Sequence, residues 1–98
     1  MSGAEGERGS GLDERRRRAI WRASHRGTKE MDIMLGTFAR ASLAAMDSAT
    51  LARFERLLAL SDPDLIAWVL APELVEGSEL GELIGALRRF HKLEPDTP

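Results

Sequence analysis

Apolar residues recur every three or four positions along most of the chain, the spacing typical of amphipathic helices. The longest such stripe consists of Met31, Met34, Leu35, Phe38, Ser42 and Ala45. No segment alternates apolar and polar residues convincingly over the length of a strand. The pattern therefore predicts an all-α fold, a compact bundle of about five short helices joined by tight turns.

Capping residues and breaks suggest where the first three helices lie. The first is expected over about 13–24, with Asp13 as its N-cap. The second should begin after Gly27 and run to about residue 46. The third restarts with Asp47 or Ser48 as its cap.

Two further helices follow in the second half of the chain. Asp62 is the expected N-cap of the fourth, with Pro63 at the first helical position, where a missing N–H is not needed. Pro72 should end that helix or lie just beyond its end. The fifth is expected to start with Ser78 as its cap and to run to about Lys92.

The helical faces also predict which side chains form the core. Ile20 and Trp21 should supply the apolar contacts of the first helix. In the later helices the expected core residues are Leu51, Phe54, Leu57, Leu58, Leu65, Trp68, Val69, Leu80, Leu83, Ile84, Leu87 and Phe90. In a domain of this size the leucines and the aromatic residues should carry most of the stability.

Length and composition indicate one small domain. The chain has 98 residues, of which 43% are hydrophobic and 31% charged. We expect a disordered tail over residues 1–12, a helical domain over 13–93 and a frayed end over 94–98. No run approaches the ~20 apolar residues of a membrane span, and the N-terminus does not read as a signal peptide. With no cysteine present, a cytoplasmic location is expected, and the apolar stripes predict a monomer.

Charge is distributed unevenly although the net charge is only −2. Residues 1–30 hold eight basic and five acidic side chains, whereas residues 31–98 hold six basic and eleven acidic ones. The run from Arg15 to Arg18 could therefore bind nucleic acid. On a helix, however, four consecutive side chains spread around the circumference, and the acidic chain disfavours binding to phosphates. A solvated face or a contact with an anionic partner is the preferred interpretation.

Motifs for enzyme chemistry are missing from the sequence. His25 and His91 are far apart and show no metal-ligand spacing, so we interpret both as surface residues and expect no metal site. No nucleophile elbow or glycine-rich phosphate loop occurs. We therefore expect a protein that is not an enzyme.

The stretch from Arg26 to Glu30 has two interpretations. Gly27 costs a helix about 1 kcal/mol relative to alanine, so it can simply be a helix stop beside a surface ion pair of Arg26 and Glu30. Alternatively, the glycine lets a partner approach the main chain. Arg26 would then donate bidentate hydrogen bonds to that partner, and Glu30 would accept one. The residues alone leave both interpretations open.

At these residues the chain resembles a known family, the small assembly factors for the flavoprotein subunit of succinate dehydrogenase. Their hallmark is Arg-Gly-x-x-Glu followed by Leu-Asp or Met-Asp, which here reads Arg26-Gly27-Thr28-Lys29-Glu30-Met31-Asp32. The block FERLLALSDPDLIAWVL is similar to a second family motif, and the resemblance covers about residues 16–90. Many relatives have arginine where this chain has His25.

The resemblance implies a five-helix assembly factor that binds the flavoprotein subunit and promotes covalent attachment of FAD to a histidine of that subunit. Some relatives also act on fumarate reductase. The FAD is carried by the partner, and the small protein binds no cofactor stably. We expect it to hold the flavoprotein's domains so that the partner's histidine attacks the flavin methyl group.

The expected partner-binding residues are Arg22, Arg26, Gly27, Glu30 and Asp32. No catalytic, cofactor-binding or metal-binding residue is assigned. Because some bacterial family members were once described as antitoxins, the alternative function is an antitoxin or small regulator. It would bind nucleic acid or a toxin through the basic N-terminal helix.

Overall fold

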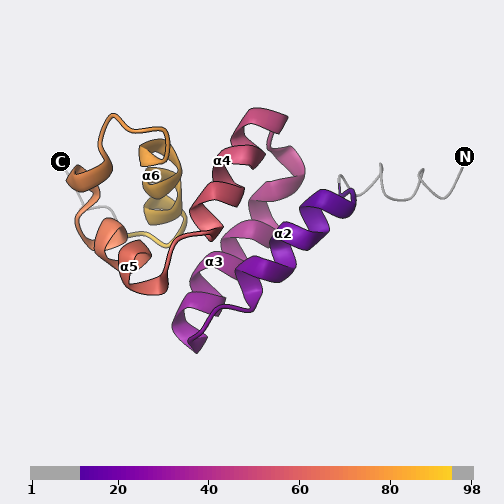
Figure 1. The fold of residues 1–98 in the computed structure, drawn as a ribbon, viewed down its shortest axis with the longest axis horizontal. Coiled ribbons are helices and arrows are strands. Elements are labelled where there is room, and N and C mark those ends of the chain that lie inside the picture. Colours follow the sequence, from indigo (N-terminus) through magenta and orange to yellow (C-terminus); the bar gives the residue numbers. More distant parts are fainter. Residues whose placement is uncertain (1–11, 94–98) are drawn as a thin grey trace, which may run out of the picture. The chain divides into compact units, whose positions relative to one another are not determined.

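The structure, a computed structural model, describes residues 12–93. Its elements are α2 (Glu14–Ser24), α3 (Lys29–Ser42), η1 (Leu43–Ala45), α4 (Ser48–Leu58), α5 (Asp62–Leu70), η2 (Pro72–Val75) and α6 (Gly81–Phe90), where η marks a 3₁₀ turn (Figure 1). No strand occurs in residues 12–93, and the all-α prediction is confirmed. The predicted tails lie outside this range, except for Leu12. None of the described helices has the length and apolar character needed to cross a membrane.

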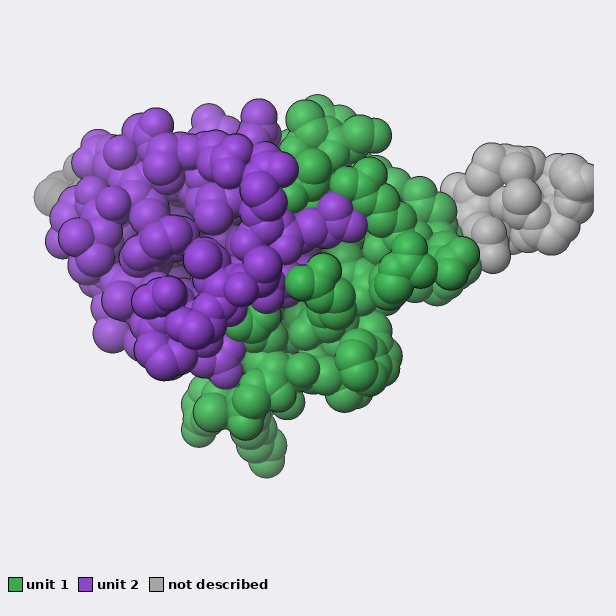
Figure 2. Space-filling model, viewed as in Figure 1, with its two compact units in different colours: residues 1–52 green, residues 53–98 purple. Residues whose placement is uncertain are grey.

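The chain divides into two compact units, residues 1–52 and residues 53–98 (Figure 2). The first contains α2, α3, η1 and the start of α4. The second contains the rest of α4 together with α5, η2 and α6. A single domain over residues 13–93 stays a prediction.

In the first unit, α2 and α3 run side by side in opposite directions, joined by the turn 25–28 (Figure 1). Its buried hydrophobic residues are Ala19, Ala23, Met31, Leu35, Phe38, Ala39, Leu43 and Leu51. The small alanines of α2 let α3 pack closely. At Gly36 an added Cβ would lie only 3.2 Å from the Cα of Ser24. The predicted stripe of α3 is therefore largely confirmed, although Ala45 is exposed.

The prediction that Trp21 contributes to the core is wrong. Its side chain is 60% exposed. The buried face of α2 is made by Ala19 and Ala23, and a residue two positions from each points to nearly the opposite side of a helix. Trp21 therefore lies on the outer surface of α2.

The second unit buries Phe54, Leu57, Leu58, Leu65, Val69, Val75, Leu80, Leu83, Ile84 and Leu87. The expected core of these helices is confirmed with two exceptions. Trp68 is only half-buried, and Phe90 is 42% exposed. Phe90 is the last residue of α6, and the chain turns immediately after it, which leaves part of its side chain exposed.

Two predicted caps in this unit are wrong. Ser61, not Asp62, caps α5, because its Oγ accepts the main-chain N–H of Asp64 at 3.2 Å. Ser78 does not cap α6; its hydroxyl donates to the carbonyl of Val75 at 2.7 Å and closes the turn after η2. The residue before α6 is Leu80, whose side chain makes no capping hydrogen bond.

Two predicted helix ends are also shifted. The second helix ends at Ser42, and the next three residues continue it as the tighter turn η1. The last helix ends at Phe90 and not at Lys92, which adopts a left-handed backbone with φ of 59°. The N–H groups of Lys92 and Leu93 then bond back to the carbonyls of Arg89 and Arg88 at 3.1 and 2.7 Å, the pattern that terminates many helices.

Candidate functional site

The candidate site is the turn between α2 and α3, which contains Gly27. Helix α2 ends at Ser24 and α3 begins at Lys29, so the chain turns at the glycine as predicted. Thr28 is the N-cap of α3: its Oγ1 accepts the main-chain N–H of Met31 at 3.3 Å. This cap was not predicted, although a threonine three positions before the first buried residue of α3 is a recognised signal.

Most of the expected partner-binding residues reach solvent. Arg22, Gly27 and Glu30 are exposed, and Arg26 is half-buried. Arg26 lies in the turn while Glu30 lies in the first turn of α3, so the two do not share one helix. Gly27 itself is exposed to solvent.

Asp32 holds the turn in place from within the first unit. Its carboxylate accepts a hydrogen bond from the main-chain N–H of Arg26, six positions earlier. The side chain is half-buried. Asp32 was expected to contact a partner; the contact that the structure shows is to the turn itself.

An aromatic pair that was not predicted joins the surface of α2 to the turn. The rings of Trp21 and His25 are stacked, with centroids 4.1 Å apart and planes inclined by 15°. His25 Nδ1 lies 2.7 Å from the main-chain oxygen of Trp21. The available signal was the spacing, because residues four apart near a helix end lie on the same side.

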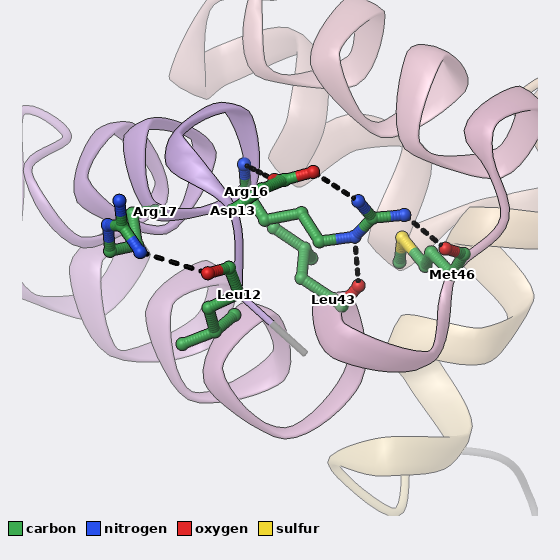
Figure 3. Close-up of polar contacts among 6 residues, drawn as sticks. All are labelled: Leu12, Asp13, Arg16, Arg17, Leu43 and Met46. Carbon is green, nitrogen blue, oxygen red and sulfur yellow. Dashed lines mark hydrogen bonds and ion pairs between the residues drawn. The ribbon is translucent and has the colours of Figure 1, made fainter. Parts of the chain in front are cut away.

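The arginine run of α2 has different roles at successive positions, as Figure 3 shows for two of them. The guanidinium of Arg16 donates to the carbonyls of Leu43 and Met46 at 2.9 and 2.5 Å, and to the carboxylate of Asp13 at 2.9 Å. Its side chain is only 17% exposed. Arg16 therefore joins the start of α2 to η1 and to the residue that follows it.

Asp13, which accepts from the Arg16 guanidinium, is also the N-cap of α2. Its carboxylate accepts the main-chain N–H of Arg16 at 2.9 Å, and this hydrogen bond holds the pKa of Asp13 below its usual value. Two neighbouring arginines make exposed contacts instead. Arg17 donates to the carbonyl of Leu12 at 2.9 Å, and Arg18 pairs with Glu14 at 2.9 Å. Only part of the basic run is thus available as a charged surface.

Metal-ligating residues do not gather in the described part of the chain. Within residues 12–93 no group of three or more His, Asp or Glu side chains could hold a metal ion. His25 is stacked on Trp21, and the ring of His91 meets that of Phe90 edge to face at 5.0 Å. The exposed turn with its charged and aromatic neighbours is suited to contact with another protein surface.

Residues 17–91 match a protein family described as flavinator of succinate dehydrogenase. This match covers the candidate turn, part of both units and all five described helices except the start of α2. The chain belongs to this family.

Curated relatives support the assignment to the flavinator family. The FAD assembly factor SdhE of Acetobacter pasteurianus is 41% identical over 68 residues, which are 69% of this chain and 62% of that protein. The FAD assembly factor SdhE of Idiomarina loihiensis is 35% identical over 69 residues, or 70% of this chain and 76% of the relative. The mitochondrial succinate dehydrogenase assembly factor 2 of Cryptococcus neoformans is 41% identical over 61 residues.

Coverage of these flavinator relatives differs. The aligned part spans less than two thirds of the Acetobacter protein and 35% of the Cryptococcus protein. No solved structure matches the chain. The names of the relatives give no support to the alternative of an antitoxin or regulator.

Proposed function

We propose that this chain is an assembly factor that binds the flavoprotein subunit of succinate dehydrogenase and promotes covalent attachment of FAD to it. The family membership supports this function, and the exposed Gly27 turn is the structural observation that carries it. A glycine that solvent reaches can also be reached by the main chain or side chains of a partner. Had this glycine been buried inside the unit, the docking interpretation would have failed.

Each expected site residue has a role in this proposal. Arg26 and Arg22 donate charge-assisted hydrogen bonds to carboxylates or carbonyls of the flavoprotein. Glu30 accepts hydrogen bonds from it. Asp32 contributes by fixing the main chain of Arg26, so that the turn is presented in one conformation before the partner arrives.

The chain itself performs no bond chemistry in this proposal and holds no cofactor of its own. The flavoprotein provides the FAD and the histidine to which it becomes attached. Binding energy at the turn stabilises a flavoprotein conformation in which the two groups are correctly oriented. Action on fumarate reductase, a cytoplasmic location and a monomeric state stay predictions.

The test is a flavinylation assay with purified apo flavoprotein subunit, FAD and this chain. Covalent flavin is read as fluorescence of the flavoprotein band in a denaturing gel. The native chain should raise that fluorescence, and Gly27→Arg and Glu30→Ala should each reduce the gain. Gly27→Arg places a long side chain where the partner must approach, and Glu30→Ala removes an acceptor.

Two matched controls separate docking from folding. Ala41→Arg adds the same charge at an exposed position of α3, and Glu82→Ala removes an exposed glutamate from the first turn of α6. Both controls should flavinylate like the native chain. No gain with the native chain, or equal losses in the controls, would contradict the proposed function.

A further inference from the structure

Trp21 is a large apolar side chain on the surface of the first unit. It is 60% exposed, whereas the other apolar residues of α2 are buried or half-buried. One face of its indole is covered by the stacked ring of His25 at 4.1 Å. The stack covers only part of the indole, so most of its apolar surface reaches solvent.

His25 restrains this indole in one orientation. Because a carbonyl oxygen only accepts hydrogen bonds, the contact of 2.7 Å requires a proton on His25 Nδ1, donated to the main-chain oxygen of Trp21. The imidazole is thereby fixed to the backbone of the residue on which it stacks. A side chain held in this way loses little conformational entropy when a partner covers it.

The aromatic pair is continuous with the candidate site. His25 directly precedes Arg26, whose main chain is fixed by Asp32, and Gly27 follows. Trp21 thus lies four residues before the first residue of the turn 25–28 and belongs to the same unit. A partner that reaches Gly27 therefore meets a segment in which the aromatic pair begins only two residues earlier, at His25.

We propose that Trp21, backed by His25, is the aromatic anchor of the docking surface and inserts into an apolar pocket of the succinate dehydrogenase flavoprotein subunit. This inference rests on the proposed function and adds a residue to its binding surface. Tryptophan is the residue type that most often dominates binding energy when it enters a dry pocket at the centre of an interface. His25 is a positioning residue, because it acts through the indole.

The chemistry around the anchor indicates the kind of pocket it fits. Arg22 and Lys29 are exposed on either side of the turn, and Arg26 lies between them. The complementary flavoprotein surface is therefore an apolar pocket with acidic groups at its rim. The charged rim orients the two proteins, and burial of the indole slows their dissociation.

The first experiment measures binding of the apo flavoprotein subunit to the full chain by calorimetry. Trp21→Ala should weaken binding by about 10- to 30-fold, and Trp21→Phe by less. Leu70→Ala is the matched control, because Leu70 is an apolar residue of the second unit with 75% exposure. It should bind like the native chain.

The second experiment tests the positioning role of His25. His25→Ala removes the stack and should weaken binding, whereas His25→Arg should restore it, because a guanidinium also stacks on indole. The chain is also labelled with 5-fluorotryptophan in the Trp68→Phe background, where the single fluorine signal reports on Trp21. Adding unlabelled flavoprotein subunit should shift that signal.

The outcomes distinguish this proposal from the function on which it rests. If the native chain neither binds the flavoprotein subunit nor promotes flavinylation, both proposals fail. If it does both and Trp21→Ala binds equally well, only the anchor is overturned. A fluorine shift that depends on the concentration of the labelled chain alone would show that a second copy covers Trp21, which also overturns the anchor.

Discussion

The carboxylate of Asp32, in the first turn of α3, accepts a hydrogen bond from the main-chain N–H of Arg26 across the turn that contains Gly27. This bond and the Thr28 cap together fix both ends of the exposed segment. The Asp of the family signature therefore has an intramolecular role: it shapes the surface that its neighbours present.

Replacing Asp32 with alanine should loosen the turn. A charge-assisted hydrogen bond from a half-buried group is lost, so we expect the free energy of unfolding to fall by about 1–2 kcal/mol in urea titrations. Flavinylation should fall further than this stability loss explains, because the turn no longer holds one conformation. Asp32→Asn keeps an acceptor oxygen and should retain more of both properties; equal losses in the two variants would contradict this role.

Removing Arg16 should destabilise the first unit more than removing its neighbour Arg18. Arg16→Ala leaves the carbonyls of Leu43 and Met46 without this donor, which we expect to cost about 2 kcal/mol in urea unfolding. Arg18→Ala breaks only an exposed pair with Glu14 and should change stability by less than about 0.5 kcal/mol. Equal effects would show that the Arg16 contacts contribute no more than a surface ion pair.

This difference affects any test of the basic helix. Neutralising the whole run from Arg15 to Arg18 would remove Arg16 and disturb the fold. A test for binding through charge must therefore change only Arg17 and Arg18, whose contacts lie at the surface. Loss of flavinylation in that double variant would show that the exposed arginines of α2 have a role in binding.

The fold was predictable because its local signals agree. Asp13 and the break at Gly27 indicated the starts of α2 and α3, which the structure places within a residue or two. One error arose where two suitable residues compete for the same cap. Ser61 and Asp62 are both good caps, and only the tertiary path of the chain shows that Ser61 has the extended backbone of an N-cap, with ψ of 157°.

The candidate site was predictable in its position but not in its internal contacts. The signature identified Arg26, Gly27 and Glu30, and the structure exposes Gly27 and Glu30 and half-buries Arg26. The apolar pattern of the first helix wrongly predicted a buried Trp21, because apolar character alone does not show which helical face packs. The stack of Trp21 on His25 depends on the path of the chain after α2, and helix propensities do not predict that path.

Acid should weaken the second unit through Glu79. Both oxygens of its carboxylate accept from the guanidinium of Arg56 at 2.8 Å, and these hydrogen bonds lower the pKa of Glu79. A lowered pKa means that the folded state favours the charged carboxylate, so the contribution is present above the unfolded pKa of ~4.3 and is lost as the pH falls through the folded value. Urea unfolding at a series of pH values from pH 6 downwards should show this loss.

The origin of that pH dependence can be checked with a double-mutant cycle. Glu79→Gln and Arg56→Gln should each flatten the dependence of stability on pH, and the double variant should flatten it no further. If the two effects add fully, the carboxylate and the guanidinium act independently, and the ion pair is not the cause.

Packing in the second unit leaves no room for a Cβ at Gly81. A Cβ at this position would lie 2.5 Å from the carbonyl oxygen of Val75, a main-chain atom that cannot move aside without shifting the turn after η2. Gly81→Ala should therefore lower the free energy of unfolding by about 1–3 kcal/mol in urea titrations.

Gly85, one turn further along α6, provides the matched control for Gly81→Ala. A Cβ there would meet only the end of the Arg89 side chain, at 3.3 Å, and a long side chain can swing away. Alanine favours a helix interior over glycine by up to ~1 kcal/mol, so Gly85→Ala should be neutral or stabilising. The same substitution thus has opposite expected signs four residues apart. If both substitutions lowered the free energy of unfolding by a similar amount, the clash with the Val75 carbonyl would not explain the loss at Gly81, and helix propensity would not determine the effect at Gly85.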